Sequence, residues 1–434
     1  MKTRREFLRS TILGASATWT VPMFIERTFA DLHAGAKDLA IQPVTGKDGT
    51  ILVVLQLAGG NDGLNTLIPY ADDAYHKARP RIGKKEKEII TLDDHVALNA
   101  SMPFMQKLFK EGNLGVVQGV GYPNPNRSHF VSTSIWETGD TSNRSSTGWI
   151  GRYFDNACSG ADPTVGISLN KTQPEAFGAL KNPGVCLSSP ELYRWIHGGG
   201  EKAQAEEFFA SINSPEDDDH PAEGASIAMP AGGKTGGIQG EGNLAFLERV
   251  AMDARVSSAK ILELASKHKT KVNYEGTPIS RSLNMVSRLI AGGMPTRVYY
   301  VSHGGFDTHN QQVNSHDRLL SQLDSALKSF FADLKEQGNA ERVVLMTFSE
   351  FGRRVTENAS AGTDHGRASC LFVAGEGVKG GLYGQYPSLT DLDQGDLKHT
   401  VDFRSVYASV LQGWLKTQAQ PILKGSYPTL PIIG

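Results

Sequence analysis

Short runs of Val, Leu, Ile and Tyr recur along the chain, and each leads into a loop of glycine and polar residues. Four runs open the segments TILVVLQLAGGNDG (50–63), LGVVQGVGYPNPNRSHF (114–130), VYYVSHGGFDTHNQQ (298–312) and ERVVLMTFSEFGRR (341–354), and a fifth is ASCLFVAG (368–375). Apolar runs without in-and-out alternation are typical of strands covered on both faces. The pattern therefore predicts a mostly parallel central sheet.

A different period separates the third and fourth runs. Between residues 313 and 337, Leu and Phe recur at spacings of three and four with charges between them, which predicts an amphipathic helix. A strand, a helix and a strand in this order form a parallel crossover. Helical patterns also occur at 244–268, 281–291 and 402–415. The expected fold is α/β, with three α/β/α layers around the sheet.

The N-terminus has the pattern of an export signal. Arg4-Arg5 precede Phe7-Leu8 and a mildly apolar stretch that ends near the small residue Ala30. This order is typical of a twin-arginine signal, and glycine, serine, threonine and proline dilute the stretch too much for a permanent membrane span. We expect a signal at 1–30, one mature domain at 31–434, passage through the twin-arginine translocation machinery, and a periplasmic or extracellular protein.

Composition narrows the function further. The 44 Lys and Arg nearly balance 46 Asp and Glu, so the chain lacks the basic footprint of a nucleic-acid-binding protein. Its three cysteines permit at most one disulfide, and the absence of C-x-x-C argues against a thiolate zinc site. Residues 197–243 are rich in Gly, Ala, Pro and acid without a period, which predicts a long flexible excursion within the mature domain.

Chemically active side chains follow the predicted strands. Ligands bind beyond the carboxyl ends of strands in open parallel sheets, where loops from neighbouring strands converge. The residues in these loops are Asp62, Arg127, Ser128, His129, His303, Asp307, His309, Glu350, Arg353, Arg354, Asp364, His365 and Arg367. Converging carboxylates repel one another unless a cation compensates them. Mixed imidazole and oxygen ligands favour zinc, manganese or iron over calcium or magnesium.

Each of these residues also has an ordinary structural interpretation. Asp62 in a glycine-rich turn is as typical of an Asx turn, and Ser128 is placed to cap a helix. Glu350 can pair with one of the arginines after it, and His303 and His309 can be satisfied loop histidines. Their shared placement after strand ends is what favours a metal or anion site.

Six motifs in order resemble the exported domain-of-unknown-function family 1501. They are LQLAGGNDGLNTLIPY, NRSHFVSTSIWETG, HGGFDTHNQQ, FSEFGRRVTEN, GTDHGRAS and TVDFRSVYASVL. The resemblance extends from about residue 50 to the C-terminus. It implies an alkaline-phosphatase-like fold, because that family is placed in the alkaline phosphatase and sulfatase superfamily of metal-dependent hydrolases and mutases. No activity is settled for the family itself.

The resemblance implies roles for individual residues. Asp62 resembles the first metal-binding Asp, Ser128 the nucleophilic hydroxyl, Asp307 with His309 the second metal site, and His365 the late metal-binding His. Glu350 stands where the superfamily has the Asp of an Asp-His pair, but Phe351 replaces the His and cannot bind a metal. One ion, two ions with His129 or His303 as a substitute ligand, and a site without catalysis all remain open.

Two functions follow from these observations. The first is an exported metal-dependent hydrolase of small anionic phosphate or sulfate esters, with Ser128 as nucleophile and Arg127, Arg353 or Arg367 holding the ester oxygens. The second is a non-catalytic exported protein that binds a metal or an anion on the same scaffold. An esterase of the α/β-hydrolase class is disfavoured, because G-x-S-x-G is absent.

Overall fold

The computed structural model of the protein describes residues 49–158, 161, 163–187, 261 and 263–434. Apart from Ile261, these residues belong to one compact unit of the chain, Met23–Ser188 and Glu263–Gly434. The predicted signal at 1–30, the excursion at 197–243 and most of the helical pattern at 244–268 lie outside the described residues.

A nine-stranded sheet forms the centre of this unit. Its order is β11-β5-β10-β9-β1-β8-β6-β7, and β14 pairs with β5. The strands are β1 (Ile51–Ala58), β5 (Leu114–Gly121), β6 (Gly166–Ser168), β7 (Val185–Cys186), β8 (Val298–Gly304), β9 (Val343–Phe348), β10 (Ser369–Ala374), β11 (Gly381–Tyr383) and β14 (Val401–Asp402). All five predicted runs form strands of this sheet, and the predicted mostly parallel sheet is confirmed.

One strand runs against the others. β1 pairs in parallel with β8 and β9, whereas β10 is antiparallel to both β9 and β5. The chain therefore enters β10 at the edge of the sheet where β1, β5, β8 and β9 end. The loop before β10 and the loops after these four strands consequently meet at one edge.

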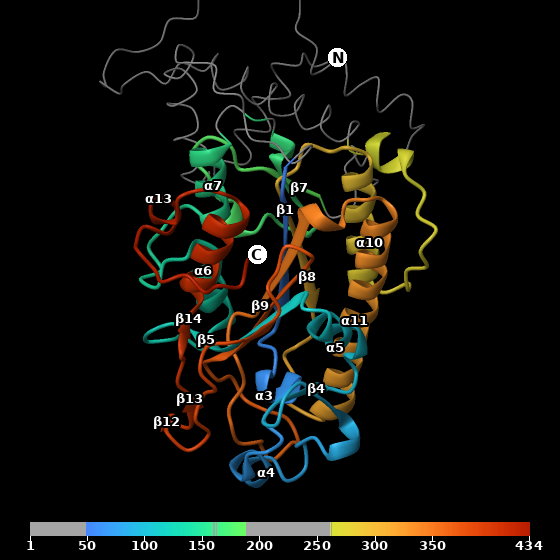
Figure 1. The fold of residues 1–434 in the computed structure, drawn as a ribbon. Coiled ribbons are helices and arrows are strands. Elements are labelled where there is room, and N and C mark those ends of the chain that lie inside the picture. The colour runs from blue at the N-terminus through green and yellow to red at the C-terminus, as the bar shows by residue number, and fades with distance from the viewer. Residues whose placement is uncertain (1–48, 159–160, 162, 188–260, 262) are drawn as a thin grey trace, which may run out of the picture. The chain divides into compact units, whose positions relative to one another are not determined.

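Helices cover both faces of the sheet, as predicted (Figure 1). One face carries α5 (Pro103–Lys110), α10 (Pro278–Ala291) and α11 (Gln312–Glu336). The other carries α6 (His129–Thr138), α7 (Trp149–Ala157), α12 (Phe403–Ser409), a π-helix (Val410–Trp414) and α13 (Ala419–Leu423). The amphipathic pattern at 313–337 is α11, whose side chains Leu320, Leu323, Leu327 and Phe330 are fully buried.

Stacked aromatic rings fix α6 and α7 against α12 on the second face. The ring of Trp136 stacks on Phe403 at 4.5 Å between centroids, and Trp149 stacks on Tyr407 at 4.5 Å. Aromatic pairs of this kind contribute about 0.5–1.5 kcal/mol beyond the area they bury. The Trp136 pair holds α6, whose first residue, His129, lies at the sheet edge.

Smaller elements complete the described part of the chain. Short strands form a three-stranded sheet, β2 (Leu67–Ile68), β4 (Ala97–Asn99) and β3 (Ile89–Thr91), and a pair, β12 (Leu392–Asp393) and β13 (Asp396–Leu397). Short helices are α3 (Gly63–Thr66), α4 (Asp73–Ala78) and 3₁₀ turns at Glu86–Glu88, Pro163–Val165, Glu175–Phe177 and Ala340–Arg342.

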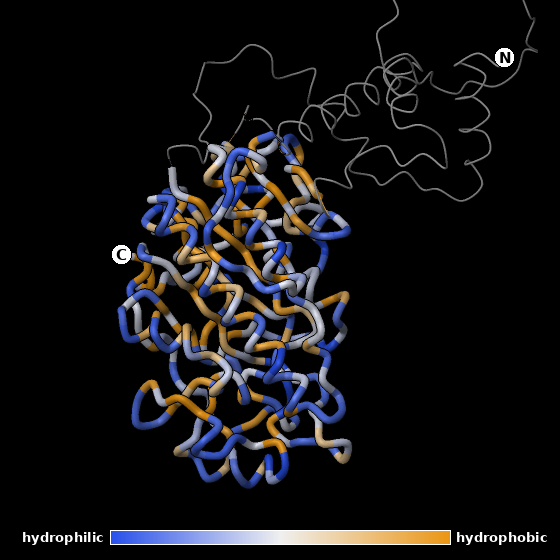
Figure 2. The backbone as a smooth tube through the Cα atoms, turned by 90° about the vertical axis from the view of Figure 1, so that its right-hand side faces the viewer, coloured by the Kyte–Doolittle hydropathy of each residue, from blue (hydrophilic) through white to orange (hydrophobic). Residues whose placement is uncertain are grey.

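Hydrophobic residues follow the interior strands, whereas many connecting loops are hydrophilic (Figure 2). Among the described helices, none combines the length and apolarity that a membrane crossing requires. Cys158, Cys186 and Cys370 are all free thiols, so the disulfide that the sequence permitted is not formed. Cys370 is buried in β10 as a small core residue.

Candidate metal centre

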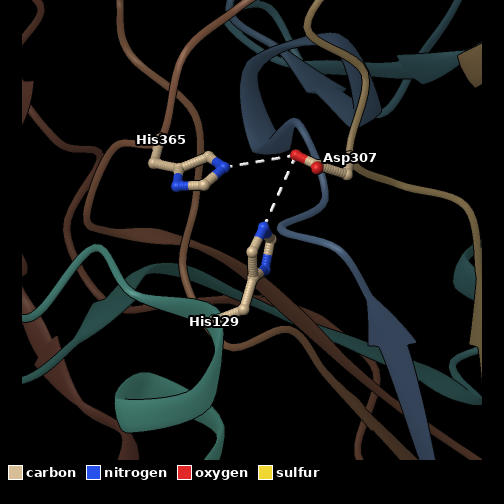
Figure 3. A group of neighbouring side chains, drawn as sticks. All are labelled: His129, Asp307 and His365. Carbon is tan, nitrogen blue, oxygen red and sulfur yellow. Dashed lines mark hydrogen bonds and ion pairs between the residues drawn. The ribbon is translucent and has the colours of Figure 1, made fainter.

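Three side chains from separate segments converge at the shared edge of the sheet (Figure 3). His129 begins α6, Asp307 lies between β8 and α11, and His365 lies in the loop between β9 and β10. Asp307 Oδ1 is 3.2 Å from His365 Nε2 and 3.6 Å from His129 Nε2. One ligand atom from each of the three lies within 4.8 Å of the others. This spacing is sufficient for the three side chains to hold one metal ion.

A third imidazole approaches the same point. His309 Nε2 lies 3.1 Å from Asp307 Oδ1 and 2.9 Å from His365 Nε2. The ring of His309 is partly exposed, so it borders the centre on the solvent side. Three Nε2 atoms thus surround one carboxylate oxygen.

The opposite nitrogen of each ring has its own acceptor. Nδ1 of His129 lies 2.8 Å from Glu350 Oε1, and Nδ1 of His365 lies 2.8 Å from the carbonyl oxygen of Arg127. Nδ1 of His309 lies 3.2 Å from Asp364 Oδ1. These partners only accept hydrogen bonds, so they assign the proton to Nδ1 and leave the Nε2 lone pair facing the centre. Metal-binding histidines are held in this way.

The spacing of the ligand atoms fits a single ion. Zinc bonds of about 2.0–2.1 Å in tetrahedral geometry place neighbouring ligand atoms about 3.3 Å apart. Asp307 Oδ1 lies 3.2 Å from His365 Nε2 and 3.6 Å from His129 Nε2, and both separations are close to that value. Without a cation, the lone pairs of neutral imidazoles would face a carboxylate oxygen, which is repulsive. The donor set therefore fits a divalent metal.

The surroundings of Asp307 and His365 shift the pKa of each side chain toward the protonation state that a metal ligand needs. Burial alone would raise the pKa of Asp307, but the hydrogen bond and charge of Arg353 and the contact with His365 hold that pKa below its usual value. Burial lowers the pKa of His365, against the opposing effects of the Arg127 carbonyl and Asp307. Asp307 is consequently ionised and His365 neutral near pH 7, as metal ligands must be.

Arg353 is a structural cation of this centre. Its side chain is fully buried, and Nη2 lies 2.7 Å from Asp307 Oδ1. The remaining donors bind carbonyl oxygens, those of Gly59, Gly60, Phe306 and Thr363. Arg353 thereby joins the loops after β1 and β8 to the loop before β10. Its donors are taken up by the protein, which is not the arrangement of a substrate-holding arginine.

Phe351 lies behind two of the imidazoles. Its ring centroid is 4.6 Å from that of His365 and 4.9 Å from that of His129, and only 2% of the residue is exposed. The ring also packs on Gly60, where an added Cβ would lie 2.3 Å from Phe351 Cε2. Phe351 therefore supports the histidines from the interior.

Glu350, predicted as a ligand, supports a ligand instead. Its Oε1 accepts hydrogen bonds from His129 Nδ1 and, at 2.9 Å, from the backbone N–H of Gly59. Only 2% of the residue is exposed. In this structure Glu350 orients His129 and does not face the centre directly.

Asp62, predicted as a metal ligand, has protein partners. Its Oδ2 lies 2.6 Å from Arg79 Nη1 and accepts from Gln312 Nε2, while Oδ1 accepts from Leu64 N at 3.2 Å and so caps α3. Both charged side chains are fully buried. Burial would raise the pKa of Asp62, but Arg79 chiefly, with its charge and hydrogen bond, lowers it below the usual value. The Asx-turn interpretation describes this geometry.

His303, also predicted as a ligand, lies beneath α11. Its Nε2 is 3.0 Å from the carbonyl oxygen of Leu319, and 4% of the residue is exposed. Burial lowers the pKa of His303. Neither Asp62 nor His303 belongs to the group formed by His129, Asp307 and His365.

Ser128 stands directly before His129 at the N-cap position of α6. It is exposed, and its side chain makes no capping hydrogen bond. Its backbone N–H donates instead to Asn126 Oδ1 at 2.7 Å. The hydroxyl is thus left at the positive end of a helix beside a candidate ligand.

Arg127 and Arg367, predicted to hold the ester, both contact Asp396. Arg127 Nη2 approaches Asp396 Oδ2, and Arg367 Nε lies 3.2 Å from the same oxygen. Sequence reasoning gave no role to Asp396, because it lies in the short strand β13 and follows none of the predicted strands. The sequence pattern predicts His129 only as a substitute ligand, although its position next to Ser128 is a signal for a role at the site.

In a comparison with sequence models of protein families, the family described as "Protein of unknown function (DUF1501)" matches residues 245–422. A search of curated proteins finds no match. The matched region contains Asp307, His309, Glu350 and His365, whereas Ser128 and His129 precede it.

Solved structures of hydrolases and related proteins show a distant similarity. The PsFucS1 sulfatase from Pseudoalteromonas sp. is 10% identical with a TM-score of 0.33, and the match covers 84% of this chain and 68% of the sulfatase. A protein in the alkaline phosphatase superfamily from Vibrio parahaemolyticus is 7% identical with a TM-score of 0.31, covering 84% of this chain and 71% of that one.

The alkaline phosphatase from the Antarctic bacterium TAB5 is 10% identical with a TM-score of 0.29, covering 76% of this chain and 93% of that one. The family match is thus confined to residues 245–422, where this part of the chain is similar to the DUF1501 family.

Proposed function

We propose that the protein is an exported, metal-dependent hydrolase of phosphate or sulfate esters. The observation that carries this proposal is the shared orientation of three imidazoles, each with Nδ1 bound to an acceptor and Nε2 directed at Asp307 Oδ1. His129, Asp307 and His365 would hold the ion, with His309 on its solvent side. The imidazole-rich donor set favours zinc, with manganese or iron as alternatives.

When bound, a divalent ion lowers the pKa of a neighbouring hydroxyl and neutralises charge on the ester. The chain supplies the nucleophile and its orientation. Ser128 Oγ lies at the positive end of α6, which favours its ionised form. Its hydroxyl is free to attack because no capping hydrogen bond holds it.

The reaction proceeds in two displacements. Ser128 Oγ bonds to phosphorus or sulfur as the bond to the alcohol oxygen breaks, the serine proton passes to solvent, and the alcohol takes a proton from solvent. Water then cleaves the seryl ester, regenerating Ser128 and releasing phosphate or sulfate. The net reaction is ester plus water to alcohol plus inorganic acid.

Export by the twin-arginine route is part of the proposal. Its support is the order of Arg4-Arg5, an apolar stretch and Ala30 in the sequence. Replacing both arginines with lysine is expected to leave the protein inside the cell, as measured by fractionation. Unchanged export of that variant would remove the route from the proposal.

A second function has one observation in its favour. The buried ring of Phe351, packed against His129 and His365, leaves no ligand at that position. A protein that binds a metal or an anion without catalysis would need no more than the group already described.

One experiment separates the two functions. The exported protein is stripped with a chelator, reloaded with zinc, manganese or iron, and assayed for metal content and for hydrolysis of 4-nitrophenyl phosphate and sulfate. We expect Ser128→Ala to abolish turnover with metal content retained, and His365→Ala to lower metal content without unfolding.

Ser134→Ala, on the exposed side of the same helix, is the matched control and should keep both properties. Stoichiometric metal without turnover of any ester would leave the binding function. Wild-type metal content in His365→Ala would refute the ligand assignment.

A further inference from the structure

Three guanidinium groups converge on one buried carboxylate beside the metal centre. Arg127 Nη2 approaches Asp396 Oδ2, Arg367 Nε lies 3.2 Å from that oxygen, and Arg354 Nε lies 3.8 Å from Asp396 Oδ1. The Asp396 side chain has no exposed surface. We refer to Arg127, Arg354 and Arg367 as the arginine cluster.

Each segment that supplies an arginine also supplies part of the metal centre. The carbonyl oxygen of Arg127 accepts from His365 Nδ1 at 2.8 Å. Arg367 comes two residues after His365, and Arg354 follows Arg353, whose guanidinium contacts Asp307. Movement of any of these segments would disturb both sites. The arginine cluster is therefore built on the same framework as the centre.

The arginine cluster keeps hydrogen-bond donors that its protein partners do not use. Its ion-pair partners are Asp396 and Asp393, which contacts Arg367, and the charge of Arg354 also acts on Asp364. Among the described residues, the guanidinium of Arg354 makes no hydrogen bond, and its only ion pair is the one at 3.8 Å. The side chains of Arg127 and Arg354 are 32% and 37% exposed. Donors remain for an anion from solution.

A cavity adjoins the arginine cluster. Its volume is about 270 Å³, and its lining joins Tyr122, Pro125 and Leu397 to the charged residues Arg367, Lys398 and Asp393. Pockets for drug-sized ligands have volumes of roughly 300–1,000 Å³, so this cavity suits a group of about one ring. Two cationic side chains against one carboxylate leave this lining with excess positive charge, so it fits a ring that carries an anionic substituent.

We infer that the substrate carries two anionic groups: the reacting phosphate or sulfate ester, and a second group on the ring of the alcohol, which the arginine cluster binds. The identity of the reacting ester rests on the proposed function, whereas the second contact rests on Arg127, Arg354 and Arg367. The sequence alone suggested that Arg127 and Arg367 hold the reacting group. Their place beside Asp396 assigns them to a neighbouring group.

The test compares ligands that differ by one carboxylate. Phenylphosphonate carries one anionic group, and 3- and 4-phosphonobenzoate carry two. Their Kd values for the zinc-loaded protein are measured by calorimetry. We expect at least one phosphonobenzoate to bind about tenfold more tightly than phenylphosphonate, the effect of one charge-assisted hydrogen bond of about 1.4 kcal/mol. The difference should shrink in 0.5 M salt, because partly exposed charges are screened.

Arg354→Gln should remove this difference, because it removes a positive charge from the arginine cluster. The variant should still fold, since the guanidinium makes no hydrogen bond that the fold requires. Arg281→Gln is the control: Arg281 lies on α10, is exposed, and donates to the carbonyl oxygen of Gly276. It should keep the wild-type difference. Equal Kd values for all three ligands, no binding of any of them, or an unchanged difference in Arg354→Gln would overturn the inference.

Phosphonates have no ester bond to cleave, so this outcome does not depend on turnover. A carboxylate-dependent difference in a protein that hydrolyses no ester would refute the hydrolase and leave the site for the second anionic group standing. Hydrolysis together with equal Kd values would do the reverse.

Discussion

Replacing Asp62 with asparagine tests whether this carboxylate stabilises the fold or binds a metal. The substitution keeps the shape but removes the charge that faces Arg79 Nη1 at 2.6 Å. The guanidinium then remains buried, since Arg79 is only 1% exposed, beside an amide in place of its counter-ion. Removing one partner of a buried ion pair costs about 3–5 kcal/mol. That is a large part of the total stability of a domain, about 5–15 kcal/mol.

The assay is urea unfolding followed by tryptophan fluorescence at pH 7, with chelator and again with zinc. We expect the loss of unfolding free energy in Asp62→Asn to be the same in both conditions. The pKa of Asp62 is lowered in the folded state, so its contribution is present above the unfolded pKa and is lost as pH falls through the folded pKa. The gap between wild type and variant should therefore narrow in acid, below about pH 4.

An exposed pair provides the control. Lys107 and Glu111 lie 3.8 Å apart one turn from each other on the surface, and Glu111→Gln should change stability by less than about 0.5 kcal/mol. A loss below about 1 kcal/mol in Asp62→Asn would refute the ion-pair reasoning. A loss seen only with zinc would restore Asp62 as a metal ligand.

Three further substitutions test other parts of the structure. Burial raises the pKa of Glu137 to about 7, so stability should fall by about 3 kcal/mol as pH rises from about 4.5 to 7, and Glu137→Gln should flatten this slope in urea titrations across pH. Glu350→Ala should weaken zinc binding about 10- to 100-fold in a chelator competition, because His129 loses its acceptor; unchanged affinity would contradict that support. Gly60→Ala should cost about 2–4 kcal/mol in the same unfolding assay, since φ is +75° and the new Cβ meets Phe351; a variant as stable as wild type would show that the ring can move aside.

Sequence periodicity was enough to predict the layers of the fold. The pattern at 313–337 differs from α11 by one residue at each end, because a long amphipathic stripe has few alternative positions. The direction of β10 was not predictable, since a strand buried on both faces has the same apolar run in either direction. That direction is nevertheless what brings His365 to the edge where Asp307 lies.

Site residues were predictable as a set but not by role. Asp307, His309 and His365 were chosen because they follow strand ends, and the structure brings them together. The same rule also selected Asp62, which follows β1. Its ion pair with Arg79 could not be predicted, because Arg79 lies on no predicted strand and a tertiary ion pair has no sequence period. Metal-ligand roles for individual residues remain predictions. Tautomers fixed by Glu350, Asp364 and a carbonyl oxygen are visible only in three dimensions.

The position of β1 has a consequence for how the protein is made. β1 is one of the first strands to leave the ribosome, but both of its neighbours, β8 and β9, come from the last third of the chain. β1 is an apolar strand, and both of its edges therefore stay unpaired until β8 and β9 have been synthesised. Pairing between strands so far apart in sequence is slow, and hydrophobic surface and strand edges that favour aggregation remain exposed until it occurs. A nascent chain that stops before β8 would be a candidate for chaperone binding and for aggregation, whatever the finished molecule does.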